Sequence, residues 1–378
     1  MSQKRRIVYV SGSRADFGLI RSTLHLIHQS KTLDLAVVAT GMHLSALHGM
    51  TISDIESSGL PIGARVAVDD TASTGATMAK NIGRMLEGLV DTFEQLRPDV
   101  VLVLGDRGEM LAAALAAIHL NIPVAHIHGG ERSGTVDEPV RHAISKLSHI
   151  HFVATEESAE RLSRMGEAPE RILVVGAPGL DGLVEHANID RDTLFGKYHL
   201  DTTLPLALML FHPVLQEASV AGKGGAKILD ALGKGLQVLA LNPNSDAGSE
   251  GIRAELETRA RNGDITLVTH LPRVEYLSFL KHADLLIGNS SSGIIEAATF
   301  GIPVVNVGTR QSLRQRNSNV IDVPVSVQAI RAAVAAALSM PRGKGDNVYG
   351  DGQAGARIVA YLADAVLDDQ LMRKINAY

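Results

Sequence analysis

The sequence predicts an α/β protein built from two Rossmann-like domains, each with a doubly wound parallel sheet. Three observations support this fold class. At 378 residues the chain is longer than one hydrophobic core usually serves, so we expect two domains. Its 45% hydrophobic and 20% charged residues are close to average globular usage. Short apolar runs alternate with amphipathic segments, a pattern that predicts parallel strands covered by helices on both faces.

The predicted strands form two series, and the same alternation restarts in the second half of the chain. The first series is residues 7–10, 35–39, 100–104, 123–127, 151–154 and 172–175. The second series is residues 206–211, 238–241, 265–268, 285–287 and 304–307. The apolar stretch 110–127 is divided by Asn121 and Pro123, so we expect a buried helix and strand there rather than a membrane span.

A Gly-Ala-Pro-Gly turn at residues 176–179 marks the predicted domain boundary. We expect an N-terminal domain over residues 1–177 and a C-terminal domain over residues 178–345. A loop rich in Gly, Asp and Asn then precedes a helical pattern at residues 356–367. We therefore expect residues 346–378 to carry a helix that packs back across the domain interface, in an arrangement like that of glycosyltransferase-B enzymes.

Charge and cysteine content exclude several classes of function. The net charge of −5 arises from 36 basic and 41 acidic residues without long runs of one sign, so we expect no nucleic-acid and no membrane partner. The absence of cysteine excludes disulfides and thiolate metal sites and fits a reducing compartment. The basic start is followed by a short apolar run broken by Arg14 and Asp16, unlike a signal peptide. We expect a cytoplasmic protein.

Polar motifs follow the predicted strands of the first half, where ligands bind in open parallel sheets. The motif Gly-Ser-Arg-Ala-Asp-Phe-Gly at 12–18 offers backbone N–H groups and the Arg14 guanidinium to a phosphate. The alternative is a simple turn with Asp16 near a helix start. Three ionisable groups, Asp106, Arg107 and Glu109, follow the strand at 100–104 and are placed to face a ligand. The alternative is an Asp-Arg pair that caps the next helix.

The strand at 123–127 ends in His-Ile-His-Gly-Gly-Glu, and its period of two places His126 and His128 on one face. A metal pair is one interpretation, but two histidines make a poor zinc site, and an acid/base or phosphate-contacting role needs no metal. A buried, hydrogen-bonded imidazole is the structural alternative for His126. Farther on, Asp137 and Glu138 open a helix, where the helix dipole favours carboxylates for local reasons. This interaction with the helix dipole is a sufficient explanation for Asp137, but a weaker one for Glu138.

The second half carries a pattern typical of a phosphate site. Its residues 288–296 read Gly-Asn-Ser-Ser-Ser-Gly-Ile-Ile-Glu, a strand-to-helix turn with three hydroxyls and several N–H groups. Glu296 can accept both hydroxyls of a ribose, or can act only as a stabilising charge in the first turns of a helix. His212, held by Pro213 in an extended conformation, ends another strand, and Arg310 follows the next one.

One domain thus supplies carboxylates and histidines, and the other supplies a phosphate and ribose pocket. A nucleotide bound to the second domain would direct its sugar toward Asp106, His128, Glu131 and Glu138. The sequence therefore predicts a nucleotide-sugar enzyme whose substrate lies in a cleft between two domains and reacts at the sugar next to the diphosphate.

Together these motifs resemble the UDP-N-acetylglucosamine 2-epimerases. The resemblance rests on residues 12–18, 105–107, 126–131, 141–142, 211–213, 288–296 and 308–310, in order, and extends from about Ile7 into the helix that follows residues 347–352. The His-Ile-His-Gly-Gly-Glu form resembles the hydrolysing branch of bacterial sialic-acid and legionaminic-acid synthesis. The non-hydrolysing branch generally has a glutamate where His128 stands.

The resemblance implies an anti elimination of UDP to 2-acetamidoglucal, followed by hydration to N-acetylmannosamine, without a cofactor or metal. It implies UDP-N-acetylglucosamine as the bound partner and a homodimer or dimer of dimers. Its proton-transfer candidates are Asp106, Glu131 and Glu138, with His128 and His142 nearby. Its diphosphate-stabilising candidates are His212, Arg14, Ser290 and Ser291. Glu296 would hold the ribose, and the further substrate or nucleotide contacts are Arg107, Asp181, Asn244, His270 and Arg310.

Four alternatives remain open. A hydrolysing 2-epimerase for a GDP-linked diacetamido sugar of legionaminic-acid synthesis shares the chemistry and differs in base and sugar substituents. A retaining glycosyltransferase shares the architecture, but it gives no reason for several carboxylates opposite the nucleotide. A non-catalytic nucleotide-sugar sensor should have lost those carboxylates. A metal-dependent hydrolase would be built on His126 and His128, and it would lose activity in a chelator.

Overall fold

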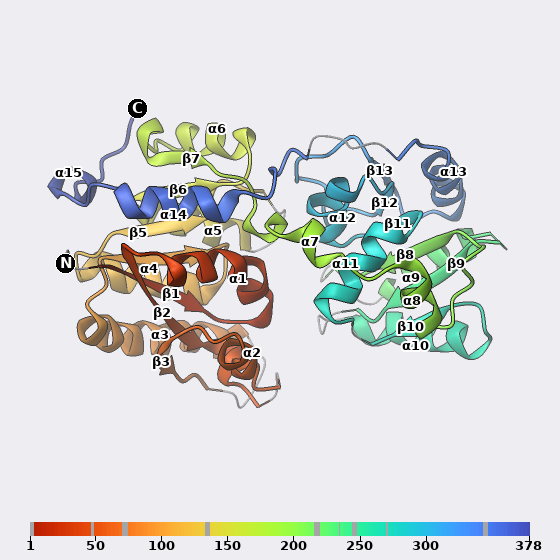
Figure 1. The fold of residues 1–378 in the computed structure, drawn as a ribbon, viewed down its shortest axis with the longest axis horizontal. Helices are drawn as coiled ribbons and strands as arrows, with labels where there is room; N and C mark the ends of the chain where they lie inside the picture. Colours follow the sequence, from red (N-terminus) through yellow and green to blue (C-terminus); the bar gives the residue numbers. More distant parts are fainter. Residues whose placement is uncertain are drawn as a thin grey trace. The chain divides into compact units, whose positions relative to one another are not determined.

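The protein separates into two compact units (Figure 1). The computed structural model describes residues 4–46, 49–69, 75–132, 137–214, 220–233, 235–243, 248–269, 271–342 and 347–378. Unit 1 comprises Met1–Asp181 and Tyr349–Tyr378, and unit 2 comprises Gly182–Val348. The boundary lies shortly after the predicted position at residue 177. The C-terminal residues are part of unit 1 itself, where the helix α14 (Ala354–Asp364) contributes Ile358 and Leu362 to the core.

Unit 1 is built on a parallel sheet in the order β3-β2-β1-β4-β5-β6-β7. Its strands are β1 (Arg5–Ser11), β2 (Leu33–Thr40), β3 (Ile62–Val66), β4 (Val100–Leu104), β5 (Val124–Ile127), β6 (Ile150–Val153) and β7 (Ile172–Val174). Successive residues of β1 face opposite sides: Ile7 and Tyr9 join one core, and Val8 and Val10 join the other. Two cores on one sheet confirm the predicted doubly wound fold.

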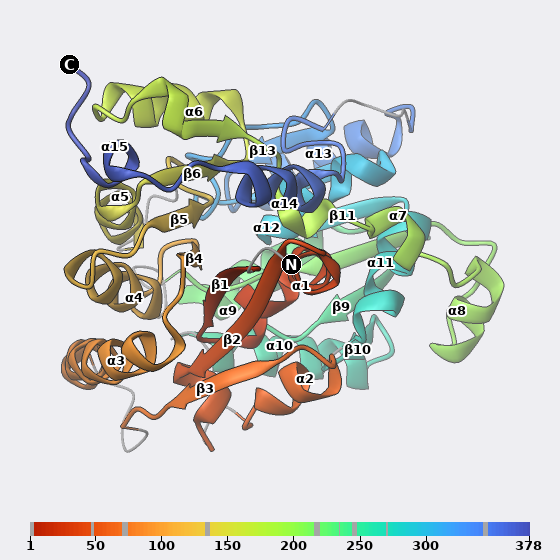
Figure 2. The same cartoon turned by 60° about the vertical axis from the view of Figure 1, so that its left-hand side comes forward.

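Helices cover both faces of the sheet in unit 1. They are α1 (Arg14–Gln29), α2 (Ile52–Ser57), α3 (Gly75–Leu96), α4 (Gly108–His119), α5 (Asp137–Leu147), α6 (Glu156–Arg164), α14 and α15 (Asp369–Met372), with the 3-10 turns η1 (Gly41–Leu44), η2 (Pro169–Arg171) and η3 (Pro178–Leu180). The helices α1, α2 and α14 cover the face of Ile7, whereas α3, α4 and α5 cover the face of Val8. Figure 2 shows α3, α4 and α5 stacked along one side of the sheet.

Unit 2 repeats this design with a parallel sheet in the order β10-β9-β8-β11-β12-β13. Its strands are β8 (Leu206–Leu210), β9 (Gln237–Leu241), β10 (Thr266–Val268), β11 (Leu285–Gly288), β12 (Val304–Val307) and β13 (Val320–Val323). Its helices are α7 (Leu183–His186), α8 (Arg191–Lys197), α9 (Ala221–Ala231), α10 (Ser249–Arg261), α11 (Arg273–His282), α12 (Ser291–Ile295) and α13 (Val327–Leu338), with the 3-10 turn η5 (Ala297–Phe300). The helices α9, α10 and α13 share one core with the sheet.

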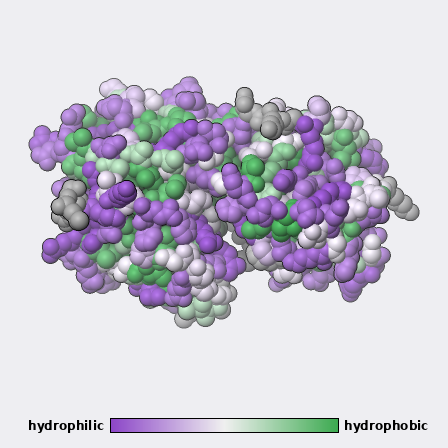
Figure 3. Space-filling model, in the orientation of Figure 1, coloured by the Kyte–Doolittle hydropathy of each residue, from purple (hydrophilic) through white to green (hydrophobic). Residues whose placement is uncertain are grey.

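The two strands that the sequence does not predict, β3 and β13, both lie at sheet edges. Edge strands are covered less and so tolerate polar residues. Gly63 and Arg65 interrupt the apolar run of β3, and Asp322 interrupts that of β13. Residues 110–127 form α4 and β5, as predicted. Among the described residues no helix is both long and apolar enough to cross a membrane. On the face drawn in Figure 3, polar side chains surround small apolar patches.

Candidate functional site

Each sheet has one point at which the strand order reverses, and candidate residues follow the strands on either side of it. In unit 1 the reversal lies between β1 and β4, and in unit 2 it lies between β8 and β11. At such points the loops after adjacent strands diverge and leave room for a ligand. The motif at 12–18 follows β1 and Asp106 follows β4, while His212 follows β8 and Ser290 follows β11.

A buried arginine joins two of the predicted carboxylates in unit 1. Arg141, on α5, forms an ion pair with Asp106, and its Nη1 lies 3.4 Å from Glu131 Oε2. The Arg141 and Glu131 side chains are only 4% and 7% exposed, so both charges depend on each other. Burial alone would lower the pKa of Arg141, but Glu131 and Asp106 outweigh burial and raise it. The guanidinium therefore stays charged.

The turn after β5 brings His128 to the same carboxylates. Its Nδ1 bonds Glu131 Oε1 in a short contact, and both residues are buried. His128 has a φ of +63°, a left-handed conformation that non-glycine residues seldom adopt. This conformation turns the chain back so that Glu131, three residues later, faces the imidazole. The backbone thus holds His128 and Glu131 as one pair.

His126 is the buried, hydrogen-bonded imidazole that the structural alternative expects. It is fully buried, with Nε2 2.7 Å from the Gly105 carbonyl and Nδ1 3.1 Å from Ser145 Oγ. Burial lowers its pKa to about 3, so the ring is neutral near pH 7. His126 therefore ties β5 to the turn that carries Asp106. Among the described residues, no group of three or more His, Asp or Glu side chains is arranged to hold a metal ion.

Helix α5 presents Glu138, Arg141 and His142 together, because residues three and four apart share a helix face. The Glu138 carboxylate lies 3.8 Å from His142 Nε2, and the two side chains are 23% and 26% exposed. Burial is the largest influence on His142 and leaves its pKa below the usual value. A carboxylate next to a neutral, partly exposed imidazole can move a proton to or from a ligand. Asp137 begins the helix, where the dipole favours its charge.

Arg107 pairs with Glu109 rather than with Asp106. Its Nε lies 3.6 Å from Glu109 Oε2. Burial would lower the pKa of Arg107, but Glu109 and other nearby carboxylates raise it. Glu109 in turn fills the space beside Gly12 and Gly41, where an added Cβ would lie within 2.8 Å of its side chain. Glycine is therefore required in the motif after β1 because a buried carboxylate supports it.

Two other predicted contacts of unit 1 have local partners. Arg14 Nε lies 2.7 Å from Asp54 Oδ2 in an exposed ion pair. Asp16 forms a capping box with Ser13 at the start of α1, as the simpler interpretation of this motif expects. The Asp181 carboxylate accepts hydrogen bonds of 3.0 and 2.6 Å from the first two N–H groups of α14. Asp181 thus caps a helix, and its contact with a nucleotide stays a prediction.

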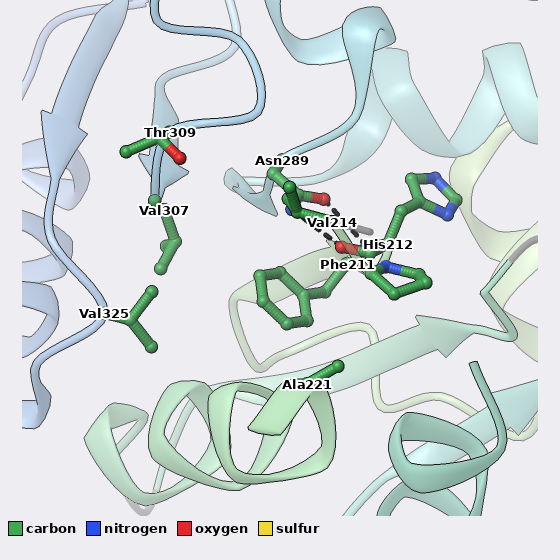
Figure 4. Close-up of a pocket in the computed structure, with 10 residues that line it drawn as sticks. Phe211, His212, Val214, Ala221, Asn289, Val307, Thr309 and Val325 are labelled. Atoms are coloured by element: carbon green, nitrogen blue, oxygen red, sulfur yellow. Dashed lines mark hydrogen bonds between the residues drawn. The ribbon is translucent and has the colours of Figure 1, made fainter. Parts of the chain in front are cut away.

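In unit 2 the strand ends β8 and β11 meet closely at Gly288. Its φ is +136°, and an added Cβ would lie 1.9 Å from the Leu210 carbonyl oxygen. The next residue, Asn289, accepts a 2.7 Å hydrogen bond from the His212 N–H and donates a 2.8 Å bond to the His212 carbonyl. Figure 4 shows these bonds and the His212 ring directed away from the Phe211 ring. Asn289 therefore fixes the backbone from which His212 projects.

The hydroxyl motif forms a short helix start with a fixed carboxylate behind it. Ser290 caps α12, and Ser291 is its first residue. Glu296 accepts a 2.5 Å hydrogen bond from Ser292 and a 2.6 Å bond from Arg273. Because α12 ends at Ile295, Glu296 is its C-cap rather than a residue of its first turns. The carboxylate is buried and held by two partners, so its orientation is defined before a ligand binds.

A small pocket lies beside this motif. Phe211, Val307 and Val325 form its apolar wall, and His212, Asn289 and Thr309 contribute polar groups (Figure 4). Next to it, Arg310 donates a 3.2 Å hydrogen bond to the Asn289 carbonyl. The structure thus gathers His212, Ser290, Ser291, Glu296 and Arg310 in unit 2. Asn244 and His270 lie outside the described residues.

The sequence indicated Arg141 only as part of a motif and did not indicate Arg273 at all. The sequence could have indicated Arg141, because it lies three residues after Glu138 and therefore shares a helix face with that candidate. The same helix follows the candidates Asp106 and Glu131 in the chain. No sequence pattern indicated Arg273, because 23 positions separate it from Glu296 and only the fold brings the two side chains together. Chemically, unit 1 offers carboxylates and imidazoles for proton transfer, and unit 2 offers N–H groups, hydroxyls and a carboxylate for a phosphorylated ribose.

Comparison with known proteins gives consistent matches. A family model described as UDP-N-acetylglucosamine 2-epimerase matches residues 25–363. The hydrolysing UDP-N,N'-diacetylbacillosamine 2-epimerase of Legionella pneumophila is 50% identical, covering 99% of this chain and 100% of that one. The UDP-N-acetylglucosamine 2-epimerase of Neisseria meningitidis serogroup B is 34% identical, covering 92% and 91%. A crystal structure of UDP-GlcNAc 2-epimerase from Neisseria meningitidis bound to UDP-GlcNAc has a TM-score of 0.81 at 20% identity, covering 94% and 99%, and so shares the fold.

Proposed function

The chain belongs to the UDP-N-acetylglucosamine 2-epimerase family, and we propose from this premise that its substrate is a UDP-linked 2,4-diacetamido sugar, UDP-N,N'-diacetylbacillosamine. The enzyme is a hydrolysing nucleotide-sugar 2-epimerase. The observation that carries the substrate proposal is a difference in identity. The relative named for the diacetamido sugar is 50% identical over the whole chain, whereas the one named for UDP-N-acetylglucosamine is 34% identical.

UDP-N-acetylglucosamine, which the family resemblance alone favoured, becomes the second candidate. A GDP-linked sugar is the third, supported by the GDP/UDP-N,N'-diacetylbacillosamine 2-epimerase of Campylobacter jejuni, which is 34% identical and covers 85% of this chain. All three substrates carry an acetamido group on the second carbon and a nucleoside diphosphate on the first. The reaction proposed below therefore applies to each of them.

We infer a reaction in two steps. A base removes the proton from the second carbon while the bond from the first carbon to the diphosphate oxygen breaks, so UDP leaves with the bonding electrons and a double bond remains. Water then adds across this double bond, with hydroxyl at the first carbon and a proton at the second carbon from the opposite face. The products are UDP and the free 2-epimer, and no electron is gained or lost.

Unit 1 supplies the proton-transfer groups in this proposal. We assign removal of the first proton to Glu138, because it lies next to the imidazole of His142 and is partly exposed, as contact with a substrate requires. Asp106 pairs with Arg141, Arg141 lies against Glu131, and Glu131 contacts His128, so this chain of contacts holds three polar side chains in fixed positions for the sugar. We propose that this group delivers the proton in the second step and orients the water.

Unit 2 binds the leaving group in this proposal. Diphosphate gains charge as it departs, and N–H donors at the start of α12 together with Ser290, Ser291, His212 and Arg310 can stabilise that charge without rearrangement. Glu296, oriented by Arg273 and Ser292, is placed to accept the ribose hydroxyls. Each fixed donor to the departing diphosphate typically contributes about 3 kcal/mol to catalysis.

Proton NMR of the enzyme in deuterated water with a chelator tests the proposal. Separate samples contain UDP-N,N'-diacetylbacillosamine, its GDP analogue and UDP-N-acetylglucosamine. We expect the first to give UDP and a free 2-epimer deuterated at the second carbon, at a kcat/KM at least about tenfold above the other two, which corresponds to about 1.4 kcal/mol.

Each other outcome of the NMR experiment names a different function. Preference for UDP-N-acetylglucosamine or for the GDP sugar would replace the proposed substrate with that one. Cleavage without deuterium at the second carbon would remove epimerisation and point to glycosyl transfer or hydrolysis. Activity that disappears in the chelator would revive the metal-dependent hydrolase.

A further inference from the structure

Residues 369–378, the C-terminal segment, lie against the last strands of unit 1. The Arg171 guanidinium, just before β7, donates a 2.8 Å hydrogen bond to the Gln370 carbonyl. Near the end of the chain, Ala377 N–H donates a 2.8 Å hydrogen bond to the Gly166 carbonyl. The short helix α15 forms the start of the segment (Figure 2). The segment is therefore part of the folded unit and reaches the helix that carries Glu138, Arg141 and His142.

Lys374 makes that contact with α5. Its Nζ donates hydrogen bonds of 2.9 Å to the Ser145 carbonyl and 2.5 Å to the Ser148 carbonyl, at the C-terminal end of the helix. The last carbonyls of a helix have no partner within it and lie at the negative end of its dipole. The Ser145 carbonyl accepts a 3.1 Å hydrogen bond from the Ser148 N–H, and the Lys374 ammonium adds a charged donor and a positive charge at this end of the helix. The Lys374 side chain is only 15% exposed, so water competes little for these bonds.

A buried carboxylate holds Lys374 in place. Glu167 Oε2 lies 2.6 Å from Lys374 Nζ and 2.9 Å from His151 Nε2, and Glu167 Oε1 lies 2.7 Å from Lys146 Nζ. The Glu167 side chain is 1% exposed. Burial alone would raise its pKa, but hydrogen bonds from His151, Lys146 and Lys374 outweigh burial and lower it to about 2. Glu167 is therefore an ionised anchor at neutral pH, and it belongs to none of the catalytic candidates.

The C-terminal end of α5 is linked to the catalytic candidates by short contacts. Ser145 Oγ bonds both the Arg141 carbonyl and His126 Nδ1, each at 3.1 Å. His126 Nε2 bonds the carbonyl of Gly105, the residue before Asp106. On the same helix, the Arg141 side chain pairs with Asp106 directly. A shift in the last turn of α5 would therefore move Arg141 relative to Asp106.

We propose that Lys374 is a positioning residue for the epimerisation, acting by holding the last turn of α5 so that Arg141 keeps its place between Asp106 and Glu131. This inference rests on the proposed function, since it takes α5 as a catalytic helix. Lys374 touches none of the proposed reacting groups, and its contribution is transmitted through the helix.

The test compares Lys374→Met, which removes the ammonium and keeps the length of the side chain, with the control Arg373→Met. Arg373 is the neighbouring exposed cation, and its hydrogen bonds, to the Asp369 carbonyl and from Arg171, are made by backbone atoms that Arg373→Met keeps. Hydrogen–deuterium exchange, kcat and UDP affinity are measured for each. We expect Lys374→Met to speed amide exchange in α5 at least about tenfold, to lower kcat about tenfold and to leave the UDP dissociation constant unchanged.

Three results would overturn the proposal: unchanged exchange in α5, faster exchange with an unchanged kcat, or faster exchange throughout unit 1 and unit 2. The last would show a general loss of stability. If the wild-type enzyme epimerises none of the nucleotide sugars, that result contradicts the proposed function and does not depend on Lys374. The exchange of α5 then still shows whether Lys374 fixes the helix.

A pH profile provides a readout that a purely structural contact would not change. Burial lowers the pKa of Lys374 to about 8, with Glu167 opposing this shift and Lys146 and Arg171 adding to it. His149 and His151 also face Lys374. Because Lys374 loses its charge as pH rises through about 8, wild-type kcat should fall there, and the fall should be smaller in Lys374→Arg, which stays charged. An identical alkaline limb in Lys374→Met would contradict the proposal.

Discussion

Unit 1 and unit 2 place their polar residues at the same point of the same kind of sheet, yet they use opposite chemistry there. In unit 1, Asp106 after β4 pairs with Arg141 on α5, and the same guanidinium lies against Glu131 after β5, so formal charges predominate. At the β8/β11 reversal, hydroxyls and the backbone of a short helix predominate, and a single ion pair holds Glu296. The difference teaches that the architecture fixes where a site forms, while the residues at the strand ends decide its chemistry.

The glycines at the two reversals differ in the same way. Gly12 leaves room for the side chain of Glu109, a charged group. Gly288 leaves room for the Leu210 carbonyl, so that two strands can approach. Unit 1 thus makes space for a carboxyl side chain, whereas unit 2 brings backbone groups together. We expect changes in unit 1 to affect kcat, and changes in unit 2 to affect nucleotide affinity.

The largest expected effect comes from Arg141→Met. Removing the guanidinium leaves the buried Glu131 and the partly buried Asp106 without their counterion, so we expect kcat to fall about 10³-fold, or about 4 kcal/mol. The UDP dissociation constant, measured by calorimetry, should stay within about twofold. Arg164→Met is the matched control, because Arg164 forms only an exposed pair with Glu160, a kind worth about 0.5 kcal/mol. A parallel loss of UDP affinity would break the division between the units.

The next effect is expected from Glu138→Gln, which keeps the shape of the proposed base and removes its ability to accept a proton. General-base contributions are typically about 10²-fold or more, so we expect kcat to fall by at least that factor with UDP affinity unchanged. Deuterium incorporation at the second carbon should slow equally. Glu160→Gln on α6 serves as the exposed control. If Glu138→Gln keeps full activity while Glu131→Gln loses it, Glu131 is the base.

Acid pH should distinguish the two units through histidines that differ in burial. The pKa of His126 is lowered to about 3 in the folded protein from about 6.5 in the unfolded chain, so the unfolded chain binds more protons as pH falls below 6.5. At pH 5 this costs about 2 kcal/mol of unfolding free energy relative to pH 7.

Urea unfolding at the two pH values measures this acid effect, and His126→Gln should reduce the pH dependence by that amount. His282 in unit 2 provides the comparison. Its pKa is also lowered by burial, but its side chain is partly exposed, so His282→Gln should change the pH dependence less. Equal effects of the two variants would remove the contrast between the units.

The smallest expected effect is that of Arg273→Met. Without this partner Glu296 keeps only the Ser292 hydroxyl, so its orientation toward a ribose is less defined. We expect UDP affinity to weaken about threefold, or about 0.7 kcal/mol, with little change in kcat. Arg253→Met, at an exposed position of α10, is the control. Tighter UDP binding in Arg273→Met would instead show that Arg273 competes with the ribose for Glu296.

Much of the fold could be predicted because its signals are local. Strands such as β4 and β8 are buried on both faces and form continuous apolar runs. The edge strands β3 and β13 could not be predicted because Gly63 and Arg65 interrupt the apolar run of β3 and Asp322 interrupts that of β13. The same reasoning gave the strand-end residues Asp106, His128 and His212 as site candidates, because a parallel sheet brings its carboxyl ends to one edge.

The sequence by itself determined the α/β class, the strand ends that carry polar groups and the family to which the chain belongs. Only the tertiary structure decided which charges pair. It joins Asp106 to Arg141 rather than to Arg107, assigns Asp181 to a helix cap, and places Lys374 at the end of α5. The physical reason is that apolar periodicity can be recognised within about ten neighbouring residues, whereas an ion pair depends on contacts between segments far apart in the chain.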